Sequence, residues 1–263
     1  MSLITIITDF GLKDGNVGVM KGVILGIAPQ AQIVDLSHLI QAQDILEAAL
    51  VLRRSAPYFP AGTIHVVVVD PGVGTQRRPL AARIGSQFYV GPDNGSITML
   101  VEYAMAHDWQ MQYVQLDHPG TWLEPVSHVF HGRDIFAPVA ARLANGISFD
   151  EIGSVITDPV LLNLPRPMPT ATGWVGEVIH IDHFGNISTN IGEQHLSSLD
   201  VRVRIGGAML DGLVRTFGEG KPGELVALFG STGSLIVCEV NGNAAERLKI
   251  WVGTVVTVEK LAG

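Results

Sequence analysis

Residues 66–78 read VVVVDPGVGTQRR, and this stretch decides the kind of fold that the chain adopts. Four β-branched valines are stiff and suit a strand that is buried on both faces, as in a parallel sheet. Pro71 ends the strand because it has no N–H to donate, and Gly72 and Gly74 allow a tight loop. Asp70 therefore falls at the carboxyl end of a buried strand, where open α/β sheets bind their ligands. The alternative is that Asp70 only caps the turn.

The first part of the chain alternates apolar strands with amphipathic helices. The expected strands cover residues 3–8, 32–37, 63–70 and 87–95, and the expected helices cover residues 16–29, 44–59, 97–106 and 131–146. This order predicts a mainly parallel sheet with helices on both faces, that is, an α/β sandwich domain over residues 1–158.

The composition changes after residue 158. Residues 159–172 contain four prolines and are typical of a linker. Residues 173–263 form short apolar stretches separated by glycines, which predicts an all-β domain. The expected fold is an α/β domain followed, after the linker, by a smaller barrel-like β domain.

The composition also argues against several classes of protein. Of 263 residues, 47% are hydrophobic and 16% are charged, and 17 basic against 25 acidic residues give a net charge of −8. A nucleic-acid partner is not expected, because phosphate binding needs clustered Lys and Arg. No apolar run approaches the roughly 18 residues that span a membrane, and the N-terminus resembles a strand rather than a signal peptide. With Cys238 as the single cysteine no internal disulfide can form, and we expect a cytoplasmic protein.

Six polar stretches that contain glycine directly follow apolar runs. They are residues 8–15, 68–78, 91–96, 130–136, 181–191 and 230–235. So many junctions indicate loops that meet at a shared pocket, although every α/β domain also needs polar turns. The stretches contain neither the glycine pattern of a nucleotide-phosphate loop nor a GxSxG nucleophile elbow.

One kind of site that activates water would use a metal ion. His128 and His131 are three residues apart, and His180 and His183 flank Asp182, so a metal-dependent phosphoesterase is one alternative. Neither pair lies in an HExxH frame, and we expect no metal.

The other kind of site consists of Asp70, Arg77 and His131. Arg77 follows Asp70 by seven residues, far enough for the loop to fold back. His131 stands at the start of a predicted helix, whose dipole favours a neutral imidazole. Such a set could hold and polarise a water for attack on a substrate. The alternatives are a surface charge at Arg77 and a simple helix-start turn at His131.

Motifs spread over residues 8–245 share the pattern of one family. They are TDFGLKDG, FPAGTIHVVVVDPGVGTQRR, VGPDNG, HVFHGRDIFAPVAARLANG, IDHFGNISTNI and GNAA, in family order. By these motifs the chain resembles the S-adenosyl-L-methionine (SAM) hydroxide adenosyltransferases, relatives of the fluorinating and chlorinating enzymes that use the same substrate. The resemblance implies that water or hydroxide attacks C5′ of the ribose, and that adenosine and L-methionine are released without a cofactor.

The resemblance also implies a role for each matching residue. Asp70, Arg77 and His131 would activate the water, and Asp9 would bind the ribose hydroxyls. The residues implied in binding the rest of the substrate are Asp182 at the methionine ammonium, Phe184 and Asn186 at the adenosine, Ser231 and Thr232 at the methionine carboxylate, and Asn243 and Ala244 at the adenine edge.

Several positions depart from the halogenating relatives. Thr232 stands where they have an arginine, Gln43 where they have a tryptophan, and Gly132 where they have a serine that contacts halide. Asp70 stands where they have a tyrosine. A carboxylate there favours water over halide, because it repels an anion.

The family further implies a homotrimer whose active sites lie between subunits. A non-catalytic trimer that binds SAM or adenosine is another alternative, but it would not need the intact set of Asp70, Arg77 and His131. The preferred hypothesis is a cytoplasmic, metal-independent SAM hydrolase.

Overall fold

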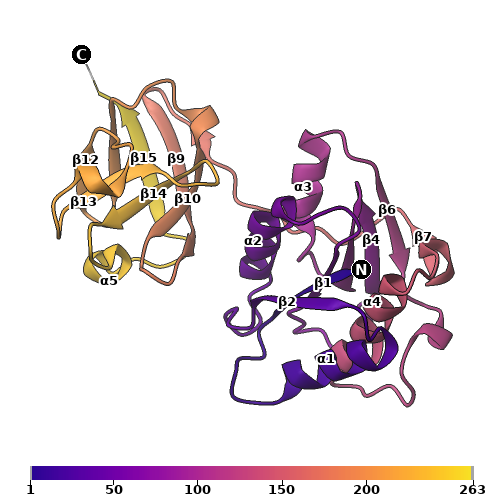
Figure 1. Cartoon of the computed structure of the whole chain (residues 1–263). Coiled ribbons are helices and arrows are strands. Elements are labelled where there is room, and N and C mark those ends of the chain that lie inside the picture. Colours follow the sequence, from indigo (N-terminus) through magenta and orange to yellow (C-terminus); the bar gives the residue numbers. More distant parts are fainter. Residues whose placement is uncertain (1, 262–263) are drawn as a thin grey trace. The chain divides into compact units, whose positions relative to one another are not determined.

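The computed structural model describes residues 2–261 of the chain. Residue 1 and residues 262–263, at the outer ends of the two predicted domains, fall outside the described residues. The chain divides into two compact units, one ending at Leu162 and the other beginning at Asn163 (Figure 1).

The first unit is built around one twisted sheet. Its strands are β1 (Leu3–Thr8), β2 (Gln32–Ser37), β3 (Ile64–Val68), β4 (Pro79–Ile84), β5 (Gln87–Pro92), β6 (Met111–Gln115) and β7 (Ser154–Ile156). They lie in the order β2-β1-β3-β5-β4-β6-β7, and β4 and β7 run antiparallel to the others. The mainly parallel sheet predicted from the sequence is confirmed.

Helices cover both faces of this sheet. They are α1 (Asn16–Ile27), α2 (Ile45–Ser55), α3 (Thr98–Ala106) and α4 (Ala137–Ala144). On one face, Val66 and Val68 pack in a core with residues of α1 and α4. On the other face, Val67 and Val69 pack with residues of α2 and α3. The valine run is therefore buried on both sides, as its composition indicates.

Some elements differ from those expected. The strands β4, β6 and β7 were not predicted, because they pair antiparallel and do not follow the strand–helix alternation. The helix expected over residues 131–146 begins instead as a π-helix, Gly132–Phe136, and continues as α4. The helix expected to reach residue 59 ends at Ser55, because Pro57 cannot donate to the next helical turn. Short 3-10 helices lie at Ala56–Tyr58, Pro119–Thr121, Phe149–Glu151, Glu193–His195 and Phe217–Glu219.

The second unit is an antiparallel β structure. Its strands are β8 (Met168–Pro169), β9 (Gly173–Ile181), β10 (Ile187–Gly192), β11 (Val201–Ile205), β12 (Ala208–Asp211), β13 (Leu225–Phe229), β14 (Ser234–Glu239) and β15 (Val255–Lys260), with the helix α5 (Ala244–Leu248) after β14. They pair in the order β12-β11-β15-β9-β10-β14-β13, and β8 pairs with β9. The Val214 N–H donates to the Ala227 carbonyl at 2.9 Å, which links the segment after β12 to β13 and nearly closes the sheet. The barrel-like domain predicted from the sequence is confirmed.

The segment predicted as a linker, residues 159–172, is held at both ends. The N–H groups of Val160 and Leu162 donate to Asp93 Oδ1 and Thr98 Oγ1, at 2.7 and 2.8 Å. Farther along, β8 pairs with β9. The first residues of this segment therefore belong to the first unit, and its last residues belong to the second.

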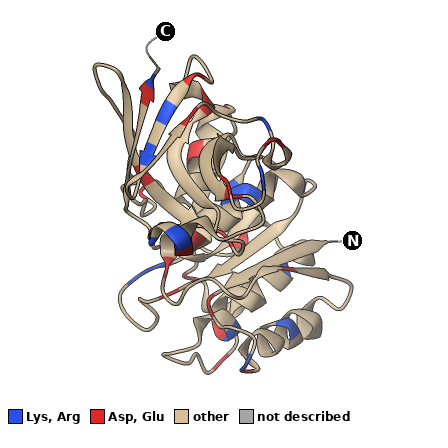
Figure 2. Ribbon diagram, turned by 90° about the vertical axis from the view of Figure 1, so that its left-hand side faces the viewer, with Lys and Arg blue, Asp and Glu red and all other residues tan. Residues whose placement is uncertain are grey.

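The charges of the protein are mixed. Figure 2 shows Lys and Arg residues interspersed with Asp and Glu residues, in keeping with a net charge of −8 for the whole sequence. Some form exposed pairs, such as Arg202 and Asp211 at 2.6 Å, which contribute little to stability. Among residues 2–261, no helix has the length and apolar character needed to cross a membrane.

His65 is a fully buried histidine in the middle of the sheet. Gln87 donates through its amide nitrogen to two backbone carbonyls, so its Oε1, 3.4 Å from His65 Nε2, is an acceptor. The proton of His65 therefore lies on Nε2, and Nδ1 accepts from Thr5 Oγ1 at 2.7 Å. Burial lowers the pKa of His65 from 6.5 to about 4, because it penalises the charged imidazolium.

We expect the free energy of unfolding to fall as the pH decreases from about 6.5 to about 4. In this window the unfolded state binds a proton at His65 that the folded state does not, which costs up to about 3 kcal/mol of stability. Urea unfolding between pH 7 and pH 4 measures the slope. In His65→Asn, whose amide can take the place of Nδ1 opposite Thr5, the slope should be shallower; an unchanged slope would assign the acid sensitivity to other groups.

Candidate active site

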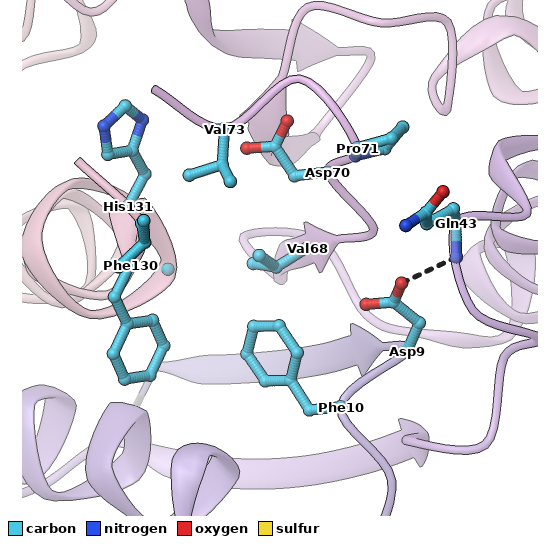
Figure 3. Close-up of a pocket in the computed structure, with 11 residues that line it drawn as sticks. Asp9, Phe10, Gln43, Val68, Asp70, Pro71, Val73, Phe130 and His131 are labelled. Atoms are coloured by element: carbon cyan, nitrogen blue, oxygen red, sulfur yellow. Dashed lines mark hydrogen bonds between the residues drawn. The ribbon is translucent and has the colours of Figure 1, made fainter. Parts of the chain in front are cut away.

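A cavity of about 280 Å³ opens at the carboxyl ends of β1 and β3 (Figure 3). It is lined by Asp9 and Phe10 after β1, Gln43 before α2, Val68, Asp70, Pro71 and Val73 at the end of β3, and Val129, Phe130, His131 and Gly132 at the start of the π-helix. Three of the polar stretches expected to form a pocket, residues 8–15, 68–78 and 130–136, therefore do meet.

Asp70, Arg77 and His131 form one hydrogen-bonded set. Arg77 Nε donates to Asp70 Oδ1 at 2.8 Å, and Arg77 Nη2 donates both to Asp70 Oδ2 and to His131 Nδ1, the latter at 2.9 Å. The side chains of Asp70 and Arg77 are only 5% and 10% exposed, so the ion pair is withdrawn from water. Arg77 is thus not a surface charge: it supports two residues that line the cavity, and its two-point contact fixes their geometry.

The protonation state of His131 follows from this geometry. A guanidinium has donors but no acceptor, so Nδ1 must accept and the ring proton must lie on Nε2. Burial lowers the pKa of His131 below 6.5, and the positive charge of Arg77 lowers it further. At neutral pH the set therefore holds an uncharged imidazole with a free Nε2–H beside a carboxylate.

The loop after β3 is packed against the segment that precedes His131. Gly74 has a φ of +76°, and a Cβ added there would lie 2.3 Å from the carbonyl oxygen of His128. Only glycine combines that backbone angle with so close an approach. The packing brings Arg77 within reach of the imidazole across 54 residues of sequence.

Asp9 lies at the other side of the cavity with Gln43. The backbone N–H of Gln43 donates to Asp9 Oδ2 at 2.8 Å, as the dashed line in Figure 3 shows. Gln43 has a φ of +68°, a left-handed conformation that a residue other than glycine rarely adopts. Gln43 lines the cavity together with Phe10 and Phe130. None of these three was predicted as a site residue. The sequence could have indicated them only by position, because each belongs to a loop at the carboxyl edge of the sheet.

The polar stretch 91–96 does not line the cavity but braces it. Asp93, which is 4% exposed, accepts from Arg78 Nε at 2.8 Å, and Asn94 Nδ2 donates to the Val69 carbonyl at 2.9 Å. These contacts fix the chain just after β3 and just before β4, and thereby both ends of the loop between them.

The other predicted site residues lie in the second unit. Asp182 Oδ1 accepts from the N–H groups of Phe184 and Asn186, both at 2.9 Å, and its Oδ2 accepts from Asn186 Nδ2 at 2.8 Å. Phe184 is 70% exposed. The carbonyl of Gly185 accepts from the N–H of Ala245 at 3.0 Å, so this turn packs against the start of α5. The turn that carries Asp182, Phe184 and Asn186 therefore lies next to Asn243 and Ala244 at the start of α5.

Asn243 and Ala244 begin α5. Asn243 Oδ1 accepts from the Glu246 N–H at 2.9 Å and caps the helix, while Ala244 is buried. Ser231 and Thr232 lie in the exposed turn between β13 and β14, at the opposite end of β14 from α5. The second unit therefore carries its predicted binding residues in two places separated by the length of β14.

Two further chemistries find little support in the side chains. Among residues 2–261, no group of three or more His, Cys, Asp and Glu side chains lies close enough to hold a metal ion. Cys238 is buried in β14, and burial raises its pKa to about 12, so its thiol is inert.

The geometry is that of an α/β enzyme whose polar side chains converge at the carboxyl edge of the sheet. The sequence matches the SAM hydroxide adenosyltransferase N-terminal domain over residues 4–153 and the C-terminal domain of the same family over residues 176–257. The chain belongs to this family, and the prediction that it is a hydrolase is confirmed.

Individual relatives agree with the family assignment. The chain is 40% identical over 254 residues to the (R)-S-adenosyl-L-methionine hydrolase of Salinispora tropica, with 95% of each chain covered. It is 29% identical over 300 residues to a fluorinase of Actinoplanes sp., with 98% of this chain and 97% of the relative covered. The crystal structure of an uncharacterized conserved protein from Thermotoga maritima matches with a TM-score of 0.89 at 33% identity, covering 98% of this chain and 100% of that one. The relationship to the halogenating enzymes is therefore also confirmed.

We expect Gly74→Ala to abolish most of the activity. The added methyl group meets the His128 carbonyl and must push the loop away, which separates Arg77 from the imidazole. Gly62→Ala is the matched control, because Gly62 has a φ of +82° but no atom within 4 Å of an added Cβ. It should lose about 1 kcal/mol of stability and keep its rate. Equal activity of the two variants, measured with thermal melting as a check on folding, would contradict the packing argument.

Proposed function

We propose that the protein hydrolyses SAM to adenosine and L-methionine by attack of water on C5′ of the ribose, with Asp70, Arg77 and His131 as the set that activates the water. The observation that supports this most directly is the buried, hydrogen-bonded set at the cavity of a member of this family. The relative with 40% identity is itself named a SAM hydrolase.

The reaction needs a well-placed nucleophile rather than an acid. The sulfonium of SAM is already an activated leaving group, so methionine departs as a neutral thioether that takes up no proton. The C5′–O bond forms as the C5′–S bond breaks, and the electron pair of the broken bond goes to sulfur. The protein must hold the water in line with that bond, which is where positioning contributes most of the acceleration.

We assign Asp70 as the group that accepts a hydrogen bond from the attacking water and then takes up the proton that the water loses as the C5′–O bond forms. Arg77 has only donors, and the Nδ1 lone pair of His131 is already occupied by Arg77. Each carboxylate oxygen of Asp70 keeps a lone pair beyond its contact with Arg77, and Asp70 lines the cavity. The Nε2–H of His131 then donates to the water oxygen, while Arg77 keeps the two groups in register.

We propose the remaining substrate contacts from the resemblance to the family. Asp9 binds the ribose hydroxyls; the residues proposed to hold the rest are Asp182, Phe184, Asn186, Ser231, Thr232, Asn243 and Ala244. We propose that these residues complete the site from a neighbouring chain of a homotrimer, as the family resemblance implies. We propose that this assembly acts in the cytoplasm without a metal or cofactor.

The experiment that tests the proposal is incubation with SAM in ¹⁸O-labelled water, without metal and with chloride present. Adenosine labelled at the 5′ oxygen, together with free methionine, would support attack by water at C5′. A 5′-chloro product would assign the protein to halogenation, and binding without turnover would assign it to a sensor. Loss of turnover on adding a chelator would instead indicate a metal-dependent hydrolase.

We expect Asp70→Asn to lower kcat by about 10³-fold, because the amide cannot receive the proton of the water. Binding of the product adenosine, measured by calorimetry, should stay within about threefold of the native value, since Asp9 is untouched. Melting temperature reports any loss from breaking the buried ion pair. Equal losses in rate and in adenosine binding would make Asp70 a binding residue.

We expect the rate to fall in acid as His131 becomes protonated. Its pKa lies below 6.5, so kcat/KM should be level near neutral pH and should decline only below pH 6.5, where protonation of Nδ1 breaks the contact with Arg77. In His131→Asn the rate should be much lower, and this part of the pH dependence should vanish. A full rate at pH values where His131 is shown by NMR to be charged would exclude the neutral imidazole.

A further inference from the structure

We propose that the buried Thr8 and His38, with the solvent-exposed Asp35 behind them, form an anchor for the turn that carries Asp9, and that Thr8 and His38 are positioning residues for the ribose of the substrate. These three residues are called the Asp9 anchor below. The inference rests on the proposed function, because it takes Asp9 as the ligand of the ribose hydroxyls.

Hydrogen bonds hold the turn on both sides of Asp9. Thr8 Oγ1 lies 2.9 Å from His38 Nδ1 and also accepts from the N–H of Phe10 at 3.3 Å. The carbonyl of His38 accepts from the N–H of Gly11 at 2.8 Å. His38 therefore contacts the residue before Asp9 with its side chain and the turn after Asp9 with its backbone.

The imidazole of His38 also contacts Asp35 through Nε2, on the side of the ring away from Thr8. Its Nε2 lies 3.0 Å from Asp35 Oδ1, within electrostatic contact although not aligned as a hydrogen bond. Lys21 pairs with the other oxygen of Asp35, and these contacts outweigh burial to hold the pKa of Asp35 below 3.8. A carboxylate on this side places the ring proton on Nε2, so Nδ1 accepts from the hydroxyl of Thr8.

The order of groups resembles a nucleophile–histidine–carboxylate triad, but the structure excludes that role. The Thr8 residue is 0% exposed, so its oxygen cannot meet a substrate. Thr8 does not line the cavity, whereas its two successors, Asp9 and Phe10, do. The hydroxyl acts through the turn and not on the substrate.

The anchor adds to a second constraint on Asp9. The loop that begins at His38 continues to Gln43, whose N–H donates to Asp9 Oδ2. One short segment thus holds Asp9 through its neighbours and through its carboxylate. Loss of the anchor should shift the carboxylate relative to the ribose and weaken binding more than it slows the chemistry at C5′.

Thr8→Val is the sharpest test, because it removes the hydroxyl while keeping the shape of the side chain. Thr5→Val is a matched control: Thr5 lies three residues earlier on the same strand, is 0% exposed and makes an equivalent 2.7 Å contact with His65 Nδ1, away from the cavity. We expect Thr8→Val to raise both KM for SAM and the adenosine dissociation constant by about tenfold with kcat changed less than threefold. Thr5→Val should lower the melting temperature by a similar amount and leave both constants unchanged.

Two further variants complete the design. Thr8→Ser keeps the hydroxyl and should restore near-native binding, and His38→Asn places an amide where Nδ1 stood and should bind better than His38→Ala. Native adenosine affinity in folded Thr8→Val, or equal effects of Thr8→Val and Thr5→Val, would overturn the inference. Failure of the proposed function has a different signature, because the native enzyme itself would then not release adenosine from SAM.

Discussion

The parallel pairing of β1 with β3 is the constraint on which the site depends. Thr8 pairs with Val68 at the last step of this ladder, so both strands end at the same level of the sheet. The chain leaves β1 at Asp9 and β3 toward Asp70, and two carboxylates enter one cavity from neighbouring strands. Antiparallel pairing would have sent the two loops to opposite edges.

Charge burial shapes the half of the site around Asp70. A carboxylate that is 5% exposed would be costly alone, and the two-point contact with Arg77 compensates that cost. Burial lowers the pKa of His131, and the same guanidinium lowers it further by its positive charge while occupying Nδ1. Arg77 therefore stabilises the carboxylate of Asp70, disfavours protonation of His131 and orients both side chains. Arg77 acts through Asp70 and His131, so it does not itself need to line the cavity.

Much of this was visible in the sequence, and the rest has identifiable physical causes. The strand that precedes Asp70 and the helix that begins near His131 follow from local pattern, and glycine spacing indicated the loop that brings Arg77 back. The strands β4 and β6 were not predicted, because short antiparallel strands carry little periodicity. Gln43 escaped because its role depends on a backbone N–H and a left-handed angle, which no side-chain pattern reveals. The roles proposed for Asp182 and Ser231 rest on family resemblance alone, and no sequence pattern indicated their separation along the second unit.

β1 carries two threonines that each contact a buried histidine. The same kind of hydrogen bond has a different effect at each of the two positions. Thr5 meets His65 among the strands, where the hydrogen bond satisfies polar groups that the core has enclosed. Thr8 meets His38 where the strand ends, so the same bond fixes a turn whose next residue faces the cavity. The chemistry of the two pairs is alike, and only their distance from the strand end differs. A buried hydrogen bond in the middle of a sheet contributes stability, whereas one at the carboxyl edge also sets the position of the residues that follow it.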